Sequence, residues 1–258
     1  MTVLELINVT KEYPVRRLKK PLFQARPTFR AIKKVNLTLK KGESVGLVGE
    51  SGSGKSTLAK LVMKLESLTA GSIYVNGHHI NDKNMNGRSL YKQLQIVLQD
   101  SSSSLHPKMC VRDILLEPIQ NYFPNEQDVE QRCSILMNQV NLDSSFLRRY
   151  PHQLSGGQKQ RVCIAKALAA QPTLIIFDES LVGLDQEAQL EMITMLKKIQ
   201  EKQQISYVFI THDLHSTKLL CDRVAVMYKG EIVEIFSDWD VNQFQHPYSK
   251  LLFQTLMD

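Results

Sequence analysis

A glycine-rich loop constrains the fold of this chain more than any other feature of its sequence. Residues 49–57 read Gly-Glu-Ser-Gly-Ser-Gly-Lys-Ser-Thr, in the order glycine, four residues, glycine, lysine, serine. An apolar run at 45–48 precedes the loop, and apolar residues follow it at helical spacing, at Leu58, Leu61, Val62 and Leu65. Strand, loop and helix therefore occur in the order that defines a phosphate-binding P-loop.

The chemistry of such a loop depends on four of its residues. Gly52 and Gly54 lack Cβ atoms, so the backbone can turn tightly and bring its N–H groups against phosphate oxygens. The N-terminus of the following helix favours negative charge at the same place. In a P-loop of this kind, Lys55 would reach the β- and γ-phosphates and Ser56 would hold Mg²⁺.

Length and composition indicate the number of domains and the cellular compartment of the protein. With 258 residues, 43% of them hydrophobic, it is predicted to form one large domain or two small ones with a sizeable core. No apolar run approaches the roughly 18 residues of a membrane-spanning helix, and no secretory signal is visible, so we expect a cytosolic protein. The four cysteines are scattered without a C-x-x-C pair, and we expect reduced, partly buried thiols.

The net charge of +6 is concentrated in one segment. Residues 11–41 carry eleven Lys and Arg against a single acid, Glu12. Three prolines, at 14, 21 and 27, predict a loop or hairpin insertion at 14–30 rather than a helix. A basic segment can mark contact with nucleic acid or an anionic membrane. We favour the alternative of a solvated insertion beside a phosphate site.

The apolar pattern predicts the remaining elements. Strands are expected at 3–9, 31–39, 72–75, 94–98, 173–179 and 207–210, with a hairpin turn at Asn76-Gly77. The P-loop helix is expected to end near 68–71, and another helix to span about 160–170. The serines at 101–104 are expected to form a polar linker, and the helical apolar spacing at 111–140 predicts an inserted helical lobe.

Four candidate site residues lie at the ends of apolar runs, namely Gly49, Gln99, Asp178 and His212. The run before Asp178 is continuously apolar, as expected for a strand buried on both faces of a parallel sheet. In open α/β sheets, ligands bind at the carboxyl ends of the strands. We therefore expect these four residues to converge on one edge of a sheet.

These motifs, in this order, resemble those of the nucleotide-binding subunit of ABC transporters. The resemblance covers nearly the whole chain and rests on the P-loop (Walker A), Gln99, the signature Leu154-Ser155-Gly156-Gly157-Gln158, the strand end at Asp178 and Glu179, and His212. A narrower resemblance is to the oligopeptide, dipeptide and nickel importer branch. It rests on the exact sequence of the P-loop together with Gln99-Asp100, Leu105-His106-Pro107 and His246-Pro247-Tyr248.

The resemblance implies roles for individual residues. Asp178 would hold Mg²⁺ together with Ser56 and Gln99, Glu179 would be the general base for the attacking water, and His212 would contact the γ-phosphate. Taken alone, His212 could instead be a hydrogen-bonded histidine at a strand end. The implied nucleotide-binding residues are Tyr13, Gly49, Ser51, Gly52, Gly54, Lys55, Ser56 and Thr57.

Two further motifs carry implied roles. Tyr13 resembles the aromatic residue that stacks on adenine, although an ordinary strand-edge tyrosine is the competing interpretation. In the family, the residues matching Ser155, Gly156, Gly157 and Gln158 contact the nucleotide held by the opposite subunit, so that two ATP molecules join a head-to-tail dimer. One departure is Ser180, where the family commonly has proline, while Leu184-Asp185 follows the pattern.

The implied fold is α/β, a P-loop NTPase (ABC-type) core with a mainly parallel sheet, a small antiparallel β subdomain and an inserted helical subdomain. We expect a single ABC ATPase domain over 1–258. Within it, residues 1–98 and 166–235 would form the nucleotide-binding core, 99–165 the helical subdomain and 236–258 a short C-terminal extension.

The implied function is an ATP- and Mg²⁺-dependent ATPase that energises an importer, peripheral at the cytoplasmic face of the cell membrane. Its expected partners are two membrane permease subunits, a second related ATPase subunit and an extracytoplasmic solute-binding protein. Ser180 and the short sequence after Tyr248 favour nickel or another metal as cargo, with a peptide as the alternative. An ABC-type ATPase acting on nucleic acid is disfavoured, because there are no long heptad repeats and only one ATPase unit, so no nucleic-acid partner is expected. A plain P-loop kinase or GTPase would have no use for the signature.

Overall fold

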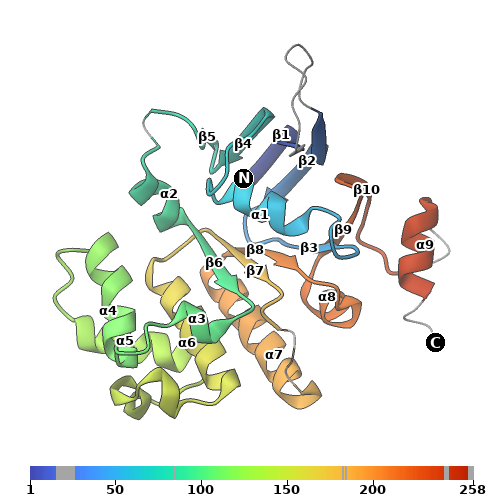
Figure 1. Cartoon of the computed structure of the whole chain (residues 1–258). Helices are drawn as coiled ribbons and strands as arrows, with labels where there is room; N and C mark the ends of the chain where they lie inside the picture. Colours follow the sequence, from blue (N-terminus) through green and yellow to red (C-terminus); the bar gives the residue numbers. More distant parts are fainter. Residues whose placement is uncertain (16–26, 84, 182, 184, 241–243, 255–258) are drawn as a thin grey trace.

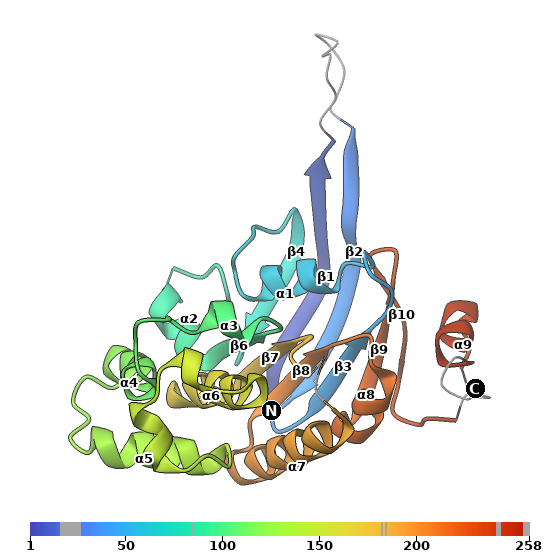
Figure 2. The ribbon, with the colours of Figure 1, turned by 60° about the horizontal axis from the view of Figure 1, so that its bottom comes forward.

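The computed structural model describes residues 1–15, 27–83, 85–181, 183, 185–240 and 244–254. Two β-sheets lie at its centre, a group of helices covers one end, and the C-terminal helix lies at the other end (Figures 1 and 2). The tip of the predicted insertion, residues 16–26, and Leu184 lie outside the described residues. No helix in the described ranges combines the length and apolar character needed to cross a membrane.

The larger sheet has six strands in the order β10-β9-β3-β8-β7-β6. Five of them run parallel, and β10 pairs antiparallel with β9 at one edge. This confirms the prediction of a mainly parallel sheet. The strands are β3 (Ser44–Val48), β6 (Leu94–Leu98), β7 (Leu174–Asp178), β8 (Ser206–Ile210), β9 (Arg223–Tyr228) and β10 (Glu231–Phe236).

The central strands of this sheet are apolar throughout because both of their faces are covered. Leu174 and Ile176 of β7 pack into one hydrophobic core, whereas Ile175 and Phe177 point into a second core on the opposite face. Alternate side chains of a strand point to opposite faces, so a strand between two cores must be apolar at every position. This arrangement explains the continuous run seen in the sequence.

The smaller sheet is antiparallel, as predicted, with the order β2-β1-β4-β5. Its two long strands form a hairpin that extends well beyond the rest of the sheet (Figure 2). Helix α1 (Lys55–Val62) packs between the two sheets, and its Leu58, Leu61 and Val62 share one core with both. The strands are β1 (Thr2–Pro14), β2 (Thr28–Lys40), β4 (Ala70–Val75) and β5 (His78–His79).

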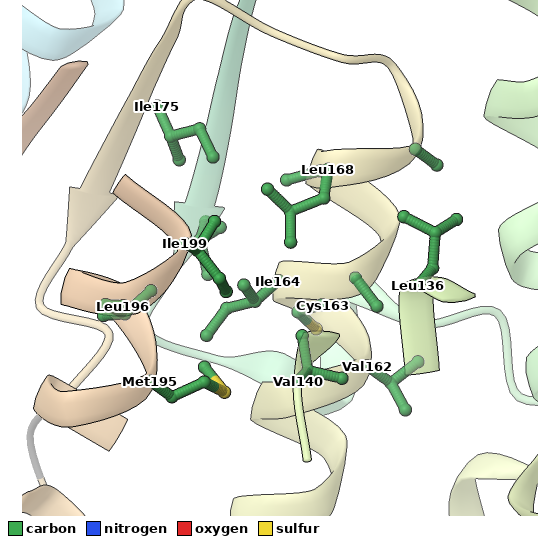
Figure 3. Packing of buried hydrophobic residues seen from close by; sticks show 14 of the residues in the cluster. Leu136, Val140, Val162, Cys163, Ile164, Leu168, Ile175, Met195, Leu196 and Ile199 are labelled. Carbon is green, nitrogen blue, oxygen red and sulfur yellow. The ribbon is translucent and has the colours of Figure 1, made fainter. Parts of the chain in front are cut away.

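The other face of the large sheet is covered by helices inserted between β6 and β7 and by the helix that follows β7. Figure 3 shows this core, in which Ile164 of α6, Leu196 and Ile199 of α7 and Ile175 of β7 pack together. The helices between β6 and β7 are α3 (Ser101–Ser104), α4 (Val111–Tyr122), α5 (Val129–Gln139) and α6 (Gly156–Ala169), with 3₁₀ turns η1 (Ser144–Arg148) and η2 (Pro151–Gln153), and α7 (Gln186–Gln203) follows β7. Helix α2 (Gly87–Gln93) precedes β6 and contributes Leu90 to the core that contains α1, and α8 (Leu214–Leu220) follows β8.

Several element limits differ from those predicted. The serine linker is the short helix α3, because Asp100 accepts a hydrogen bond from the backbone of Ser103 at 3.2 Å and its carbonyl accepts from the hydroxyls of Ser103 and Ser104. Helix α1 ends at Val62 instead of near 68–71. The helical pattern at 111–140 is split into α4 and α5, because Phe123, the residue before Pro124, has a non-helical backbone with a φ of −136°.

A third, smaller core holds the C-terminal helix α9 (Pro247–Gln254) against the sheet. Phe244 and Phe253 pack with Phe236 of β10, with ring centroids 4.5 and 5.2 Å apart respectively, and Trp239 joins them. Val48, Val224 and Val226 supply the sheet side of this core. The end of the described chain is thereby placed next to the strand that leads into the P-loop.

Candidate active site

The P-loop connects the buried strand β3 to helix α1, as predicted. Gly49 lies so close to β9 that a Cβ atom would stand 2.1 Å from the carbonyl oxygen of Met227, and Gly54 has a φ of +111°. Only glycine suits these two positions. Within the described part of the chain, no side chain caps α1, so its first N–H groups remain available to a ligand. Ser51 and Gly52 are exposed on the rim of the loop.

Lys55 lies buried at the start of α1, with 6% of its surface exposed. Its ammonium donates to the carbonyl oxygens of Gly49 at 2.6 Å and Glu50 at 2.9 Å. Burial lowers the pKa of Lys55, and the nearby carboxylates of Glu179 and Asp178 oppose that shift. The lysine is therefore held inside the loop, close enough to the two acids for their charges to act on it.

Strand β7 ends at Asp178, on the same sheet edge as the P-loop, and Glu179 follows directly. Burial, reinforced by the charge of Glu179, raises the pKa of Asp178. Glu179 has a φ of +49°, a left-handed conformation that is costly for a residue with a side chain, and its backbone N–H donates to Ile210 of β8 at 2.8 Å. This hydrogen bond joins the residue after β7 to β8, the strand that leads to His212.

His212 follows the neighbouring strand β8, and its imidazole faces Glu179. Nδ1 of His212 lies 3.5 Å from Oε1 of Glu179, and the histidine side chain is 61% exposed. The adjacent Asp213 caps α8 by accepting from the backbone N–H of Ser216, and it also accepts from the side chain of Gln189 on α7 at 2.8 Å. The sequence analysis did not single out Asp213. An aspartate just before a helical pattern is an N-cap signal and could have identified it.

Gln99 is exposed at the end of β6. The residue before it, Leu98, pairs with Asp178 in the parallel register of β6 and β7. This register brings Gln99 to the same sheet edge as Asp178, Glu179 and His212. The predicted convergence on one edge is therefore present in the structure.

The signature residues lie at the N-terminus of α6. Ser155 and Gln158 form a capping box, in which the Ser155 hydroxyl accepts from Gln158 N at 3.3 Å and the Gln158 side chain accepts from Ser155 N at 3.0 Å. Ser155 and Gly156 are exposed, and a Cβ on either glycine would meet no atom within 4 Å. Among the described residues, no recorded hydrogen bond joins this turn to the P-loop of the same chain.

Tyr13 stands at the end of β1, near the P-loop helix. Its hydroxyl donates to Glu66, and the ammonium of Lys11 lies 4.9 Å from its ring centroid. Burial and Glu66 raise the pKa of the phenol, whereas a hydrogen bond with Thr57 lowers it. The contact with Glu66 places the Tyr13 hydroxyl beside the segment that follows α1, and Lys11 lies against the ring.

Ser180, the departure from the family pattern, is 6% exposed, and its hydroxyl has no hydrogen-bond partner within the described ranges. A cavity of about 850 Å³ lies away from the P-loop, between β2 and β10. Its charged groups are largely paired, Arg30 with Glu12 and Lys33 with Glu231. We assign this cavity no part in the site.

The residues at the sheet edge suit a magnesium nucleotide. Asp178 and the side chains of Ser56 and Gln99 offer the oxygen ligands that Mg²⁺ prefers. The open N-terminus of α1 and the ammonium of Lys55 suit phosphate oxygens. Fold and site together define a P-loop nucleotide hydrolase.

Comparison with known proteins gives the family. The family model for ABC transporters matches residues 32–182. The oligopeptide transport ATP-binding protein OppF of Haemophilus influenzae is 39% identical over 242 residues, which cover 92% of this chain and 73% of that protein. The oligopeptide transport ATP-binding protein AppF of Bacillus subtilis is 37% identical over 260 residues, 99% of this chain and 78% of that protein.

A solved structure agrees with these relatives. The dimeric ATP-binding cassette MJ0796, in a post-hydrolysis state bound to ADP and Pi, superposes with a TM-score of 0.76 at 30% identity and covers 91% of this chain and 98% of that one. The chain belongs to the ABC transporter family as an ATP-binding subunit, in the branch of the oligopeptide transport ATP-binding proteins. It is an ATPase whose hydrolysis of ATP is coupled to transport.

Proposed function

We propose that this protein hydrolyses Mg²⁺-bound ATP to drive the import of oligopeptides. The ATPase site is supported above all by four residues that lie at one sheet edge, Lys55, Asp178, Glu179 and His212. The charges of both carboxylates act on Lys55, and His212 faces Glu179. The peptide cargo is supported by the names of the relatives that match over most of their length.

The proposed reaction is an in-line attack of water on the γ-phosphorus, in which the bond to the bridging oxygen breaks and ADP leaves with that oxygen. Bound Mg²⁺ would neutralise charge on the β- and γ-phosphates, and Asp178, Ser56 and Gln99 are the residues that would hold it. Lys55 and the N–H groups at the start of α1 bind the phosphates. Glu179 accepts the proton of the attacking water, and His212, 3.5 Å from Glu179, orients that carboxylate and contacts the γ-phosphate.

Tyr13 is proposed to stack on the adenine. Its position at the end of β1, with the hydroxyl bonded to Glu66 just after α1, supports this placement. One side of the ring already carries the Lys11 ammonium, so the adenine would meet the other face or displace the lysine. Ser51, Gly52 and Thr57 complete the proposed nucleotide site along the loop.

The signature residues Ser155, Gly156, Gly157 and Gln158 are proposed to contact the nucleotide of a second ATPase subunit. Three observations support this role: the turn is exposed, its glycines leave open space, and the similar cassette MJ0796 is dimeric. ATP would then lie between a P-loop from one subunit and a signature from the other. The expected partner is a related ATPase subunit of the same transporter.

The cargo expected from the sequence was a metal, and the comparisons favour the alternative, a peptide. The relatives reported above are oligopeptide transport proteins. The hydroxyl of Ser180 has no partner among the described residues, so its presence in place of proline points to no metal-specific feature. Nickel import therefore has no specific support.

The remaining partners follow from this function. Two permease subunits would form the membrane pathway and an extracytoplasmic binding protein would deliver the peptide, while this chain works at the cytoplasmic face of the membrane. We propose that residues 99–165 form a helical subdomain that receives the permease, on a core of 1–98 and 166–235 with a C-terminal extension at 236–258. Helix α6 (Gly156–Ala169) crosses from the signature into the core and would carry the coupling between them.

The variant Glu179→Gln tests the proposed chemistry. Glutamine keeps the size of the side chain but cannot accept the proton, so the rate of ATP hydrolysis should fall about 100- to 10,000-fold while ATP still binds. Hydrolysis is measured with the purified chain, alone and with a co-expressed related ATPase subunit, and light scattering with Mg²⁺-ATP should detect a trapped dimer. A wild-type rate in this variant would remove Glu179 from the role of general base.

The matched control is Glu187→Gln, in the first turn of α7. This glutamate is exposed and lies outside the proposed site, so its variant should hydrolyse ATP at the wild-type rate. The cargo is tested separately, by isolating the transporter's binding protein and identifying its ligand by mass spectrometry and metal analysis. A bound metal without a peptide would contradict the proposed cargo.

A further inference from the structure

The His246-Pro247-Tyr248 element has no part in the function proposed above, yet it touches the P-loop. Tyr248 lies in the first turn of α9 and is 7% exposed. Its ring stacks on Tyr228 of β9, with centroids 4.2 Å apart. Its hydroxyl oxygen accepts a hydrogen bond from the backbone N–H of Glu50 at 2.8 Å. The C-terminal helix therefore contacts the second residue of the loop.

That contact falls on a peptide group that also binds Lys55. The peptide between Gly49 and Glu50 donates through its N–H to Tyr248 and accepts through its carbonyl from the Lys55 ammonium at 2.6 Å. A peptide group is a rigid plane, so fixing its N–H also fixes the direction of its carbonyl. Hydrogen bonds linked in this way strengthen one another. The phenol is thus connected to the lysine through a single peptide.

Tyr248 is itself held on several sides. Glu234 of β10 accepts from the backbone N–H groups of Gln245 at 2.7 Å and His246 at 3.3 Å, which fixes the start of α9. The aromatic core around Phe253 holds the rest of the helix. Met227, next to Tyr228 on β9, closes the other side of Gly49 through its carbonyl oxygen. The first peptide of the loop is therefore clamped between β9 and α9.

We propose that Tyr248 is a positioning residue for Lys55, which holds the Gly49–Glu50 peptide in the orientation that supports the lysine when a nucleotide binds. This inference rests on the proposed role of Lys55 in binding phosphate. Without the hydroxyl, the peptide can rotate and only a fraction of the molecules present the lysine correctly. The apparent affinity for nucleotide then falls by that fraction.

The test compares Tyr248→Phe with Tyr228→Phe in the full chain. Both variants keep the stacked pair of rings, and each removes one hydroxyl, but only Tyr248 contacts the P-loop peptide. Calorimetric titration with Mg²⁺-ATP and with Mg²⁺-ADP should give a Kd about fivefold higher for Tyr248→Phe, and a Kd within about twofold of wild type for Tyr228→Phe. The melting temperature without nucleotide is measured for both variants, because the loss of a partly buried hydrogen bond lowers stability whichever role the hydroxyl has.

The outcomes separate this inference from the function it rests on. If wild type fails to bind Mg²⁺-ATP, the proposed nucleotide site is wrong, and this inference falls with it. If wild type binds and Tyr248→Phe binds equally well, only the positioning role is overturned, and a lower melting temperature with an unchanged Kd assigns the tyrosine to stability alone. In a Lys55→Ala background, titrated to millimolar nucleotide, Tyr248→Phe should change the Kd by less than about 1.5-fold. A full fivefold effect there contradicts an action through the lysine.

Discussion

At the scale of single residues, Asp178 and Glu179 are adjacent carboxylates in different surroundings. Asp178 is the last residue of β7, where burial raises its pKa, whereas Glu179 turns into a left-handed conformation and faces His212. That difference fits the separate roles proposed for them, one as a metal ligand and one as a base.

The raised pKa of Asp178 predicts a pH dependence of stability. The folded protein binds this proton more tightly than the unfolded chain, so ionisation of Asp178 reduces stability as the pH rises from the ordinary value of 3.8 through the raised pKa. Asp178→Asn removes that loss. Its free energy of unfolding relative to wild type should therefore increase between about pH 4 and pH 7 in the absence of nucleotide, as measured by urea unfolding.

Asp143→Asn is the control for this experiment. Hydrogen bonds from Ser145 lower the pKa of Asp143, so its ionised form already stabilises the fold above the ordinary value of 3.8. This variant should show no relative gain over the same pH range. A stability difference between Asp178→Asn and wild type that stays flat with pH would mean that Asp178 is not buried as described. Mg²⁺-ATP should stabilise wild type more than Asp178→Asn, because the asparagine cannot supply a carboxylate ligand.

At the scale of elements, the signature turn combines two tasks. Ser155 caps α6 through its hydroxyl, and the same exposed turn is proposed to meet a nucleotide on another subunit. A serine at this position is therefore required locally, before any ligand is considered. The two tasks can be separated because aspartate caps a helix as well as serine does.

Ser155→Ala and Ser155→Asp make that separation. Loss of the cap in Ser155→Ala should lower the free energy of unfolding by about 1 kcal/mol, whereas Ser155→Asp should keep wild-type stability. Both should weaken the ATP-dependent dimer, and the aspartate more strongly, because its charge would face the phosphates. Urea unfolding gives the stabilities, and light scattering in the Glu179→Gln background gives the dimer. A stable dimer of the Ser155→Asp variant would argue against contact with the nucleotide.

At the scale of the whole molecule, the three cores share the strands of one sheet. Val48, Val224 and Val226 of the large sheet are also part of the core that holds α9, and the alternating side chains of β7 belong to the other two cores. Disruption of the sheet therefore exposes all three cores together. This arrangement predicts cooperative unfolding that includes the C-terminal helix.

Trp239, the single tryptophan of the chain, reports on that prediction. It packs on Phe236 and Phe253 in the C-terminal core, far in sequence from the P-loop. During urea unfolding, tryptophan fluorescence and far-ultraviolet circular dichroism should have the same midpoint. The variant Phe253→Ala should lower both midpoints together, because the C-terminal core unfolds with the rest of the protein. An earlier fluorescence transition in wild type would show that the C-terminal core unfolds on its own.

The sequence by itself determined the elements whose pattern is local. The P-loop, the apolar strand that ends at Asp178 and the N-terminus of α6 each carry glycine, apolar or capping signals within a few residues. The convergence of Gln99, Asp178 and His212 could also be predicted, because parallel strands end at the same edge of a sheet. Element ends were less certain, since the helix at 101–104 depends on a single capping residue, Asp100.

Only the tertiary structure decided which distant residues meet. Tyr248 reaches Glu50, and Asp213 joins Gln189, through contacts between segments whose spacing along the chain carries no information about distance in space. The left-handed backbone of Glu179 could not be predicted from the sequence either. It occurs together with a hydrogen bond to Ile210, which lies on a neighbouring strand that is distant along the chain. Sequence periodicity records which face of an element is buried, whereas the packing of sheets and helices determines what lies against that face.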